Sequence, residues 1–124
     1  MKKIAVITGT SSGIGFETAL ALAREGYYTY ATMRNVVKGD KIKEIAQKEN
    51  LKIEVLKLDV ESDSSVKSAI KQILDKHQRI DILVNNAGWG LWGCVEDVSI
   101  DEFKAQFETN FFSIVRMVQE VGPI

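Results

Sequence analysis

Three glycines near the N-terminus have the spacing of a phosphate-binding turn. Gly9, Gly13 and Gly15 lie in the segment 8–15, directly after four apolar residues that predict a buried parallel strand. The residues 16–24 that follow predict a helix. A glycine-rich turn between a strand and a helix presents backbone N–H groups and the positive end of the helix dipole to an anion. The segment therefore predicts a pyrophosphate site.

Two other interpretations of this segment stay open. One is a glycine-rich turn that binds no ligand. The other is the phosphate loop of a nucleoside triphosphatase, which requires Lys and then Ser or Thr after its last glycine. Ile14, Gly15 and Phe16 follow Gly13 here, so the sequence disfavours a triphosphatase.

Composition narrows the class of partner. The 124 residues carry 16 Lys and Arg against 17 Asp and Glu, so no net charge indicates nucleic acid or an anionic membrane. No stretch approaches the ~20 apolar residues of a membrane span. Cys94 is the only cysteine, so no internal disulfide can form. We expect one cytoplasmic domain over residues 1–124, with small-molecule or protein partners.

The elements that must position the glycine segment alternate between strand and helix. After the first pair, apolar, β-branched and aromatic residues predict strands over 28–33, 53–58 and 81–86. Apolar residues at helical spacing predict helices over 38–50 and from Ser62 onward. Short connections predict a parallel sheet with right-handed crossovers. The expected fold is a Rossmann-type three-layer α/β sandwich with strand order 3-2-1-4 and helices on both faces.

The last part of the chain departs from this alternation. Ser99 and Glu102 predict a capping box that begins one long helix. No fifth strand follows, so we expect the fold to be truncated, the fourth strand to be an open edge and the apolar helix face to be exposed. The apolar residues at helical spacing are Phe103, Phe107, Phe111, Val115 and Val118.

Four motifs in sequence resemble those of the short-chain dehydrogenase/reductase family. They are the segment 8–15, Leu58 to Val60 after the third strand, Asn85 to Gly88 after the fourth, and Asn110 in the last helix. The resemblance covers the whole chain but only the N-terminal, cofactor-binding half of a family member. It implies an oxidoreductase that acts with a nicotinamide cofactor on an alcohol or carbonyl substrate.

The resemblance also implies a role for each matching residue. Asp59 would accept a hydrogen bond from the adenine amino group, and the Val60 backbone would contact the ring. Asn86, Ala87 and Gly88 would line the adenosine ribose. These positions follow the carboxyl ends of adjacent strands, where open parallel sheets bind ligands. The residues expected to hold the pyrophosphate are Gly9, Ser11, Ser12, Gly13, Ile14 and Gly15.

Each downstream motif also has a purely structural interpretation. Asp59 can serve as a carboxylate at the start of the next helix. The pair Asn85 and Asn86 can satisfy backbone groups at the end of the sheet, and we expect the pair to do this in addition to lining the ribose.

The end of the second strand indicates which cofactor binds. An acidic side chain there accepts a hydrogen bond from the ribose 2′-hydroxyl of NAD, whereas arginine pairs with the 2′-phosphate of NADP. Met33 occupies this position and Arg34 follows. We therefore predict NADP(H) over NAD(H), the alternative being an ordinary exposed arginine.

A second glycine pattern, from Gly88 to Gly93, matches the letters of a dinucleotide fingerprint. No helix is predicted directly after it, so we expect a loop close to the cofactor instead. Trp89 and Trp92 in this loop either line an apolar substrate pocket, as in family members acting on lipophilic carbonyls, or anchor the core. No cluster of metal ligands accompanies His77, so we expect no metal site.

The resemblance implies a catalytic Ser, Tyr and Lys beside Asn110, which would support a water relay. The tyrosines are Tyr27, Tyr28 and Tyr30, and no Tyr-x-x-x-Lys occurs. We therefore expect the chain as given to be inactive in the family reaction. Three interpretations stay open: an N-terminal fragment of a reductase, an inactive NADP-binding module, and an interaction domain that forms homo-oligomers through the last helix.

Overall fold

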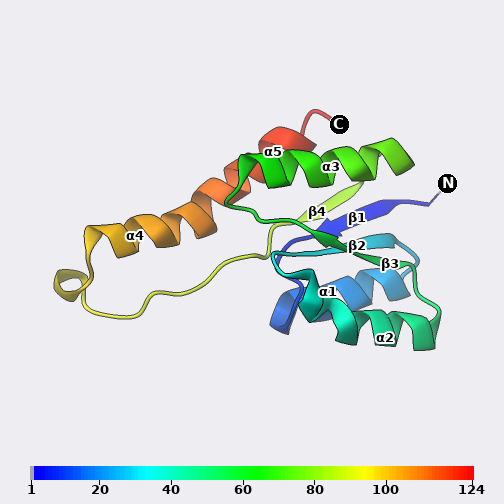
Figure 1. Cartoon of the computed structure of the whole chain (residues 1–124), viewed down its shortest axis with the longest axis horizontal. Coiled ribbons are helices and arrows are strands. Elements are labelled where there is room, and N and C mark those ends of the chain that lie inside the picture. The colour runs from blue at the N-terminus through cyan, green and yellow to red at the C-terminus, as the bar shows by residue number, and fades with distance from the viewer. Residues whose placement is uncertain (1) are drawn as a thin grey trace.

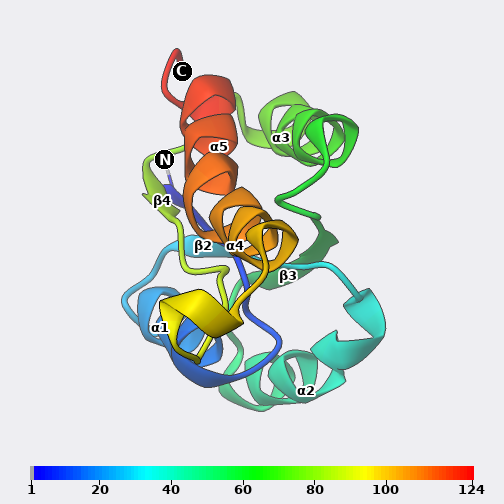
Figure 2. The same cartoon turned by 90° about the vertical axis from the view of Figure 1, so that its left-hand side faces the viewer.

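The computed structural model describes residues 2–124 and has the three predicted layers (Figure 1). Its elements are β1 (Ile4–Ile7), α1 (Gly13–Arg24), β2 (Tyr28–Met33), α2 (Asp40–Glu49), β3 (Ile53–Lys57), α3 (Asp63–His77), β4 (Ile82–Val84), α4 (Ile100–Phe107) and α5 (Ser113–Val121). The parallel sheet has the predicted order β3-β2-β1-β4. Helices α1 and α2 lie on one face, and α3 and α5 lie on the other (Figures 1 and 2).

The central strand β1 is buried along its whole length because helices cover both faces of the sheet. Its alternate side chains divide the core in two. Ile4 and Val6 pack with residues of α3 and α5, whereas Ala5 and Ile7 pack with residues of α1 and α2. Truncating a large side chain in such a core to alanine typically costs about 2–5 kcal/mol.

The parallel register brings the functional loops together. Val6 of β1 pairs with Tyr30 of β2 and with Leu83 of β4. All four strands run in one direction, so their carboxyl ends meet at the same edge of the sheet. The loop after β1 therefore lies between the ends of β2 and β4.

Several element boundaries differ from the predictions. Helix α1 begins at Gly13 rather than at residue 16. Helix α2 begins at Asp40 because a 3₁₀ turn precedes it, capped by the Asn35 side chain, which accepts from the Val37 amide at 3.1 Å. Strand β4 is shorter than predicted, since the amide of Asn86 leaves the ladder and donates to a side chain.

The prediction of one long helix at the end of the chain is wrong in one respect. The predicted capping box is present at the start of α4, but a π-helical segment, Glu108–Phe112, separates α4 from α5. The Ser113 amide donates to the carbonyl of Glu108 five residues earlier. The extra residue in this turn rotates the helix that follows. Thr109, Ser113 and Met117 consequently face the interior.

The helices of the described chain are short, and the longest of them, α3, has 15 residues. Within residues 2–124, no helix is both long enough and apolar enough to cross a membrane. Over the same range, no group of three or more His, Cys, Asp or Glu side chains is arranged to hold a metal ion.

A buried tyrosine and a half-buried histidine join β2 to the last turn of α3. The Tyr30 hydroxyl lies 2.8 Å from His77 Nε2, and Tyr30 is only 2% exposed. Burial lowers the pKa of His77, and the nearby Lys76 cation lowers it further. Burial also raises the pKa of Tyr30. Both shifts favour the neutral forms near pH 7, so the hydroxyl and the imidazole share a hydrogen bond between two uncharged rings.

His77 should make the stability of the chain depend on pH. It is the only histidine, and its pKa lies below the ordinary value of 6.5. As the pH falls, the unfolded chain takes up the proton first, so the free energy of unfolding should fall below pH 6.5 until the folded-state pKa is passed. Urea denaturation at about pH 7.5 and about pH 5.5 measures this loss.

The variant His77→Gln serves as the control for this prediction. It has no imidazole to titrate, so the difference in stability between the two pH values should shrink. An equal loss of stability in the wild type and in His77→Gln would contradict the role given to the Tyr30–His77 pair.

Candidate functional site

A cavity of about 390 Å³ opens at the carboxyl edge of the sheet. Its walls come from the loop after β1, the ends of β2 and β3, the loop after β4 and the π-helical segment. Seven predicted site residues line it: Gly9, Ser11, Arg34, Asp59, Val60, Ala87 and Gly88. Seven further residues line it, of which Trp89 was expected either to line a substrate pocket or to anchor the core: Met33, Asn35, Lys38, Leu58, Glu61, Trp89 and Thr109.

Two glycines of the first loop allow backbones to approach closely. A Cβ on Gly9 would lie 2.8 Å from the Cα of Ala87, and Gly9 also has a positive φ of 68°. A Cβ on Gly15 would overlap the carbonyl oxygen of Gly9 and the side-chain nitrogen of Asn86. The loop after β1 and the loop after β4 can therefore touch only because these two positions lack side chains.

Hydrogen bonds join the same two loops. The Asn86 side chain donates to the carbonyls of Thr8, at 3.1 Å, and of Gly9, at 3.0 Å. In return, the Thr8 hydroxyl accepts from the amides of Asn86 and Ala87, both at 3.0 Å. Asn86 thus satisfies backbone groups at the end of the sheet, as expected, and it lies behind the cavity wall that Ala87 and Gly88 form. The role of Thr8 was not predicted.

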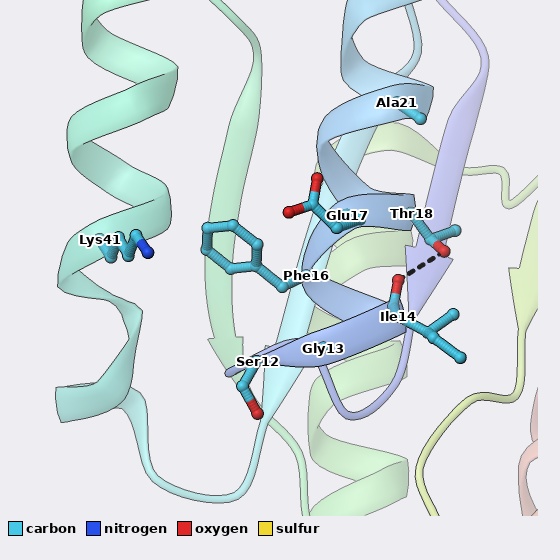
Figure 3. Close-up of a pocket in the computed structure, with 8 residues that line it drawn as sticks. All are labelled: Ser12, Gly13, Ile14, Phe16, Glu17, Thr18, Ala21 and Lys41. Carbon is cyan, nitrogen blue, oxygen red and sulfur yellow. Dashed lines mark hydrogen bonds between the residues drawn. The ribbon is translucent and has the colours of Figure 1, made fainter.

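The outer residues of the glycine segment lie elsewhere. Ser12, Gly13 and Ile14 line a second, open cavity of about 680 Å³ beside the first turns of α1, which Lys41 of α2 borders from the other side (Figure 3). Ile14 is 78% exposed. The segment therefore crosses from the edge of the sheet to the solvent-exposed start of α1, where the positive end of the helix dipole lies.

The turn after β3 holds Asp59 at the cavity. One carboxylate oxygen of Asp59 accepts from the Glu61 amide at 3.0 Å, and the Asp59 amide donates to the Ser65 hydroxyl at 2.9 Å. This is the structural role that was considered for Asp59, and it coexists with a place in the cavity wall. Val60 is 9% exposed and packs in the core that α3 and α5 share.

Basic and acidic side chains meet at the mouth of the cavity. Arg34 is 73% exposed at its side chain, and its Nη1 lies 3.5 Å from a carboxylate oxygen of Glu61. Such an exposed pair contributes about 0–1 kcal/mol, so the guanidinium can turn toward another anion at little cost. Lys38 lines the same cavity and supplies a second cation.

Asn110 holds the loop that follows β4. Its side-chain oxygen accepts from the Trp89 amide at 3.0 Å, and its side-chain nitrogen donates to the Trp89 carbonyl at 2.6 Å. The Trp89 indole donates to the Thr109 hydroxyl at 3.0 Å. Both partners belong to the π-helical segment, which therefore positions one wall of the cavity. The Asn110 side chain acts on the loop backbone and is not itself in the cavity wall.

The second glycine pattern is an irregular loop, as expected, and a short 3₁₀ turn, Val95–Asp97, follows it. The loop reaches away from the sheet toward α4 (Figure 1). Trp92 is 93% exposed, so it does not anchor the core, and Trp89 is 42% exposed beside the cavity. Cys94 is exposed in the same loop.

The residues present fit a dinucleotide. A turn without side chains at its closest contacts leads from the cavity to a helix N-terminus, which suits a pyrophosphate. Asp59 supplies a hydrogen-bond acceptor on one side, and Arg34 and Lys38 supply cations at the mouth. The site also lies at the edge where open parallel sheets bind ligands.

Comparisons with known proteins agree with this geometry. The family model for short chain dehydrogenases matches residues 3–124. The uncharacterized oxidoreductase YusZ of Bacillus subtilis (strain 168) is 40% identical over 124 residues, covering 98% of this chain and 44% of that protein. A 3-ketodihydrosphingosine reductase of Bacteroides thetaiotaomicron is 38% identical over 122 residues, covering 98% and 41%.

A solved structure shows the same arrangement of elements. It is the alcohol dehydrogenase of the archaeon Thermococcus sibiricus in complex with 5-hydroxy-NADP, with a TM-score of 0.91 and 35% identity, covering 99% of this chain and 53% of that one. The chain described here spans about half the length of these relatives. On this fold, these motifs and the family match, the chain belongs to the short-chain dehydrogenase/reductase family.

Proposed function

We propose that the chain is the NADP(H)-binding part of an oxidoreductase that interconverts an alcohol and a carbonyl compound. The observation that carries this proposal is the cavity at the carboxyl edge of the sheet, where the glycine segment, Asp59 and Arg34 meet. The 5-hydroxy-NADP in the structure of the Thermococcus sibiricus relative supports a nicotinamide cofactor. When bound, that cofactor supplies or accepts the hydride.

Each part of the proposed site has its own task. The glycine segment holds the pyrophosphate at the start of α1, and Asp59 accepts from the adenine amino group. Ala87 and Gly88 line the ribose, while Asn86 keeps their loop against the glycine segment. Arg34 pairs with the 2′-phosphate through its planar guanidinium. Lys38, which borders the same cavity, adds a second positive charge.

The 124 residues alone should bind the cofactor without turning over a substrate. The family reaction needs a proton donor at the substrate oxygen, and no Tyr-x-x-x-Lys occurs in this sequence. The Tyr28 hydroxyl donates a hydrogen bond to Glu54 at 2.9 Å, and the Tyr30 hydroxyl is hydrogen-bonded to His77. Neither tyrosine lines the cavity. Asn110 acts here by holding Trp89 and its loop in place.

We propose that the substrate is lipophilic. Trp89 borders the cavity and Trp92 is almost fully exposed in the adjoining loop. Exposed aromatic side chains next to a ligand cavity suit an apolar substrate. One relative bears the name 3-ketodihydrosphingosine reductase, which supports the same class.

Arg34 should determine the preference for NADPH. Replacing it in Arg34→Leu removes the cation that pairs with the 2′-phosphate, so the Kd for NADPH should rise by about tenfold or more while the Kd for NADH stays nearly constant. Fluorescence titration with both cofactors measures the two constants. Arg24→Leu is the matched control, because Arg24 is also an exposed arginine paired with a glutamate, Glu49.

Two results would overturn this assignment. One is equal affinity of the wild type for NADPH and NADH. The other is an unchanged preference for NADPH in Arg34→Leu.

Gly15→Ala should abolish tight binding of both cofactors. The new Cβ would displace the Asn86 side chain and so break its hydrogen bonds to the first loop, and we expect affinity to fall by about tenfold or more. Gly26→Ala is the control: its φ of 96° is also positive, but open space surrounds it. That variant should lose about 1–2 kcal/mol of stability and keep its affinity. Unchanged binding by Gly15→Ala would contradict the proposed loop contact.

The exposed face of the last helices supports a second function, assembly with another copy of the chain. Six large apolar side chains on α4, the π-helical segment and α5 are 39–54% exposed, and we assign five of them to this face. A contiguous apolar face of this kind marks an interaction surface. The residues are Phe107, Phe111, Phe112, Val115 and Val118.

Phe111→Glu should convert an assembled chain into a monomer, because it places a charge in the middle of this face. Sedimentation velocity with and without NADPH measures the oligomeric state. Val37→Glu is the matched control, since Val37 is 74% exposed on a different surface. A wild-type chain that sediments as a monomer while binding NADPH would exclude the assembly function.

A further inference from the structure

Arg116 joins α5 to the turn after β3 through one partly buried guanidinium, 18% exposed. Its Nη1 donates to the Val60 carbonyl at 2.6 Å. Its Nε donates to the Asp63 carboxylate at the start of α3, and its Nη2 donates to Glu108 at 2.9 Å. Each nitrogen of the guanidinium therefore has a partner on a different segment.

The peptide group between Val60 and Glu61 is hydrogen-bonded at both its carbonyl oxygen and its amide nitrogen. The carbonyl oxygen of the Val60–Glu61 peptide accepts from Arg116. The amide nitrogen of the same peptide donates to the Asp59 carboxylate at 3.0 Å. Because the peptide is planar, fixing its carbonyl also fixes the direction of its N–H group. The orientation of the Asp59 carboxylate is thus linked to Arg116 through one rigid unit.

The two carboxylates hold the guanidinium in place for this contact. Arg116 is always charged, and its planar donors need acceptors in fixed directions. Asp63 and Glu108 supply two of these acceptors and neutralise the charge. The next residue, Met117, is 0% exposed and shares a core cluster with Val60, so α5 and the turn cannot slide past each other freely.

We propose that Arg116 is a positioning residue for the adenine side of the cofactor site. It fixes the Val60–Glu61 peptide, which orients the Asp59 carboxylate toward the adenine amino group. The inference rests on the proposed function, in which Asp59 accepts a hydrogen bond from that amino group. It adds a residue outside the recognised motifs, and it makes α5 part of the structure that supports adenine recognition.

The test compares NADPH with its deamino analogue, in which a carbonyl oxygen replaces the adenine amino group. The wild-type chain should bind NADPH about tenfold more tightly than the analogue, because the analogue offers Asp59 no amino hydrogen at that position. In Arg116→Gln the ratio of the two Kd values should fall to about two or less, since Asp59 is no longer held in position. Loss of stability alone would weaken both ligands equally and leave the ratio unchanged.

Two further variants define the effect. Lys67→Gln is the matched control, because Lys67 also connects α3 to α5, through Glu120 at 3.9 Å, without touching Val60. It should keep the wild-type ratio. Arg116→Lys keeps the charge but cannot reach three acceptors at once. Its ratio of the two Kd values should therefore lie between those of the wild type and Arg116→Gln. If circular dichroism shows that Arg116→Gln does not fold, the lysine variant decides the question.

The outcomes separate this inference from the proposed function. A wild-type ratio near one, with NADPH bound, overturns the role of Asp59 and the inference with it. A wild-type chain that binds neither ligand overturns the proposed function as a whole. A normal wild-type ratio that persists in Arg116→Gln and Arg116→Lys overturns the positioning role alone.

Discussion

The site depends on the close approach of two backbone loops at the carboxyl edge of the sheet. The loop after β1 and the loop after β4 touch where Gly9 and Gly15 leave no room for a Cβ. Hydrogen bonds of Thr8 and Asn86 then join them. Each of these four bonds contributes about 0.5–1.5 kcal/mol to stability. Their more important effect is to hold the two loops, which form one side of the cavity, in a fixed relative position.

The turn after β3 and the loop after β4 form the other walls of the cavity, and side chains from elsewhere in the chain hold both of them in place. Ser65 holds the turn after β3 from α3, and Arg116 holds it from α5. Asn110 holds the loop after β4 from the π-helical segment. Residues that line the cavity are therefore positioned by side chains of helical segments that follow them in the chain, and a rigid scaffold commonly supports ligand-binding loops in this way.

The sequence predicts the sheet and most of the cavity because both follow from local rules. Alternating strand and helix patterns determine the strand order, and parallel strands place residues such as Gly9, Asp59 and Ala87 at one edge. The sequence does not predict that Asn110 holds Trp89 or that Arg116 holds the Val60 carbonyl, because each of these contacts joins residues more than 20 positions apart. The π-helical segment is missed for a related reason: the apolar spacing from Phe103 to Val118 fits a regular helix, and the extra residue shows only in the backbone hydrogen bonds.

The π-helical segment also affects the side of the molecule on which the cavity lies. It turns Thr109 and Met117 inward, so that one helix face both lines the cavity and packs on the core beneath Val60. The apolar residues Phe107, Phe111 and Val118 then remain on the outer face. The π-helical segment thus lets one stretch of chain line the cavity on its inner face and carry exposed apolar side chains on its outer face.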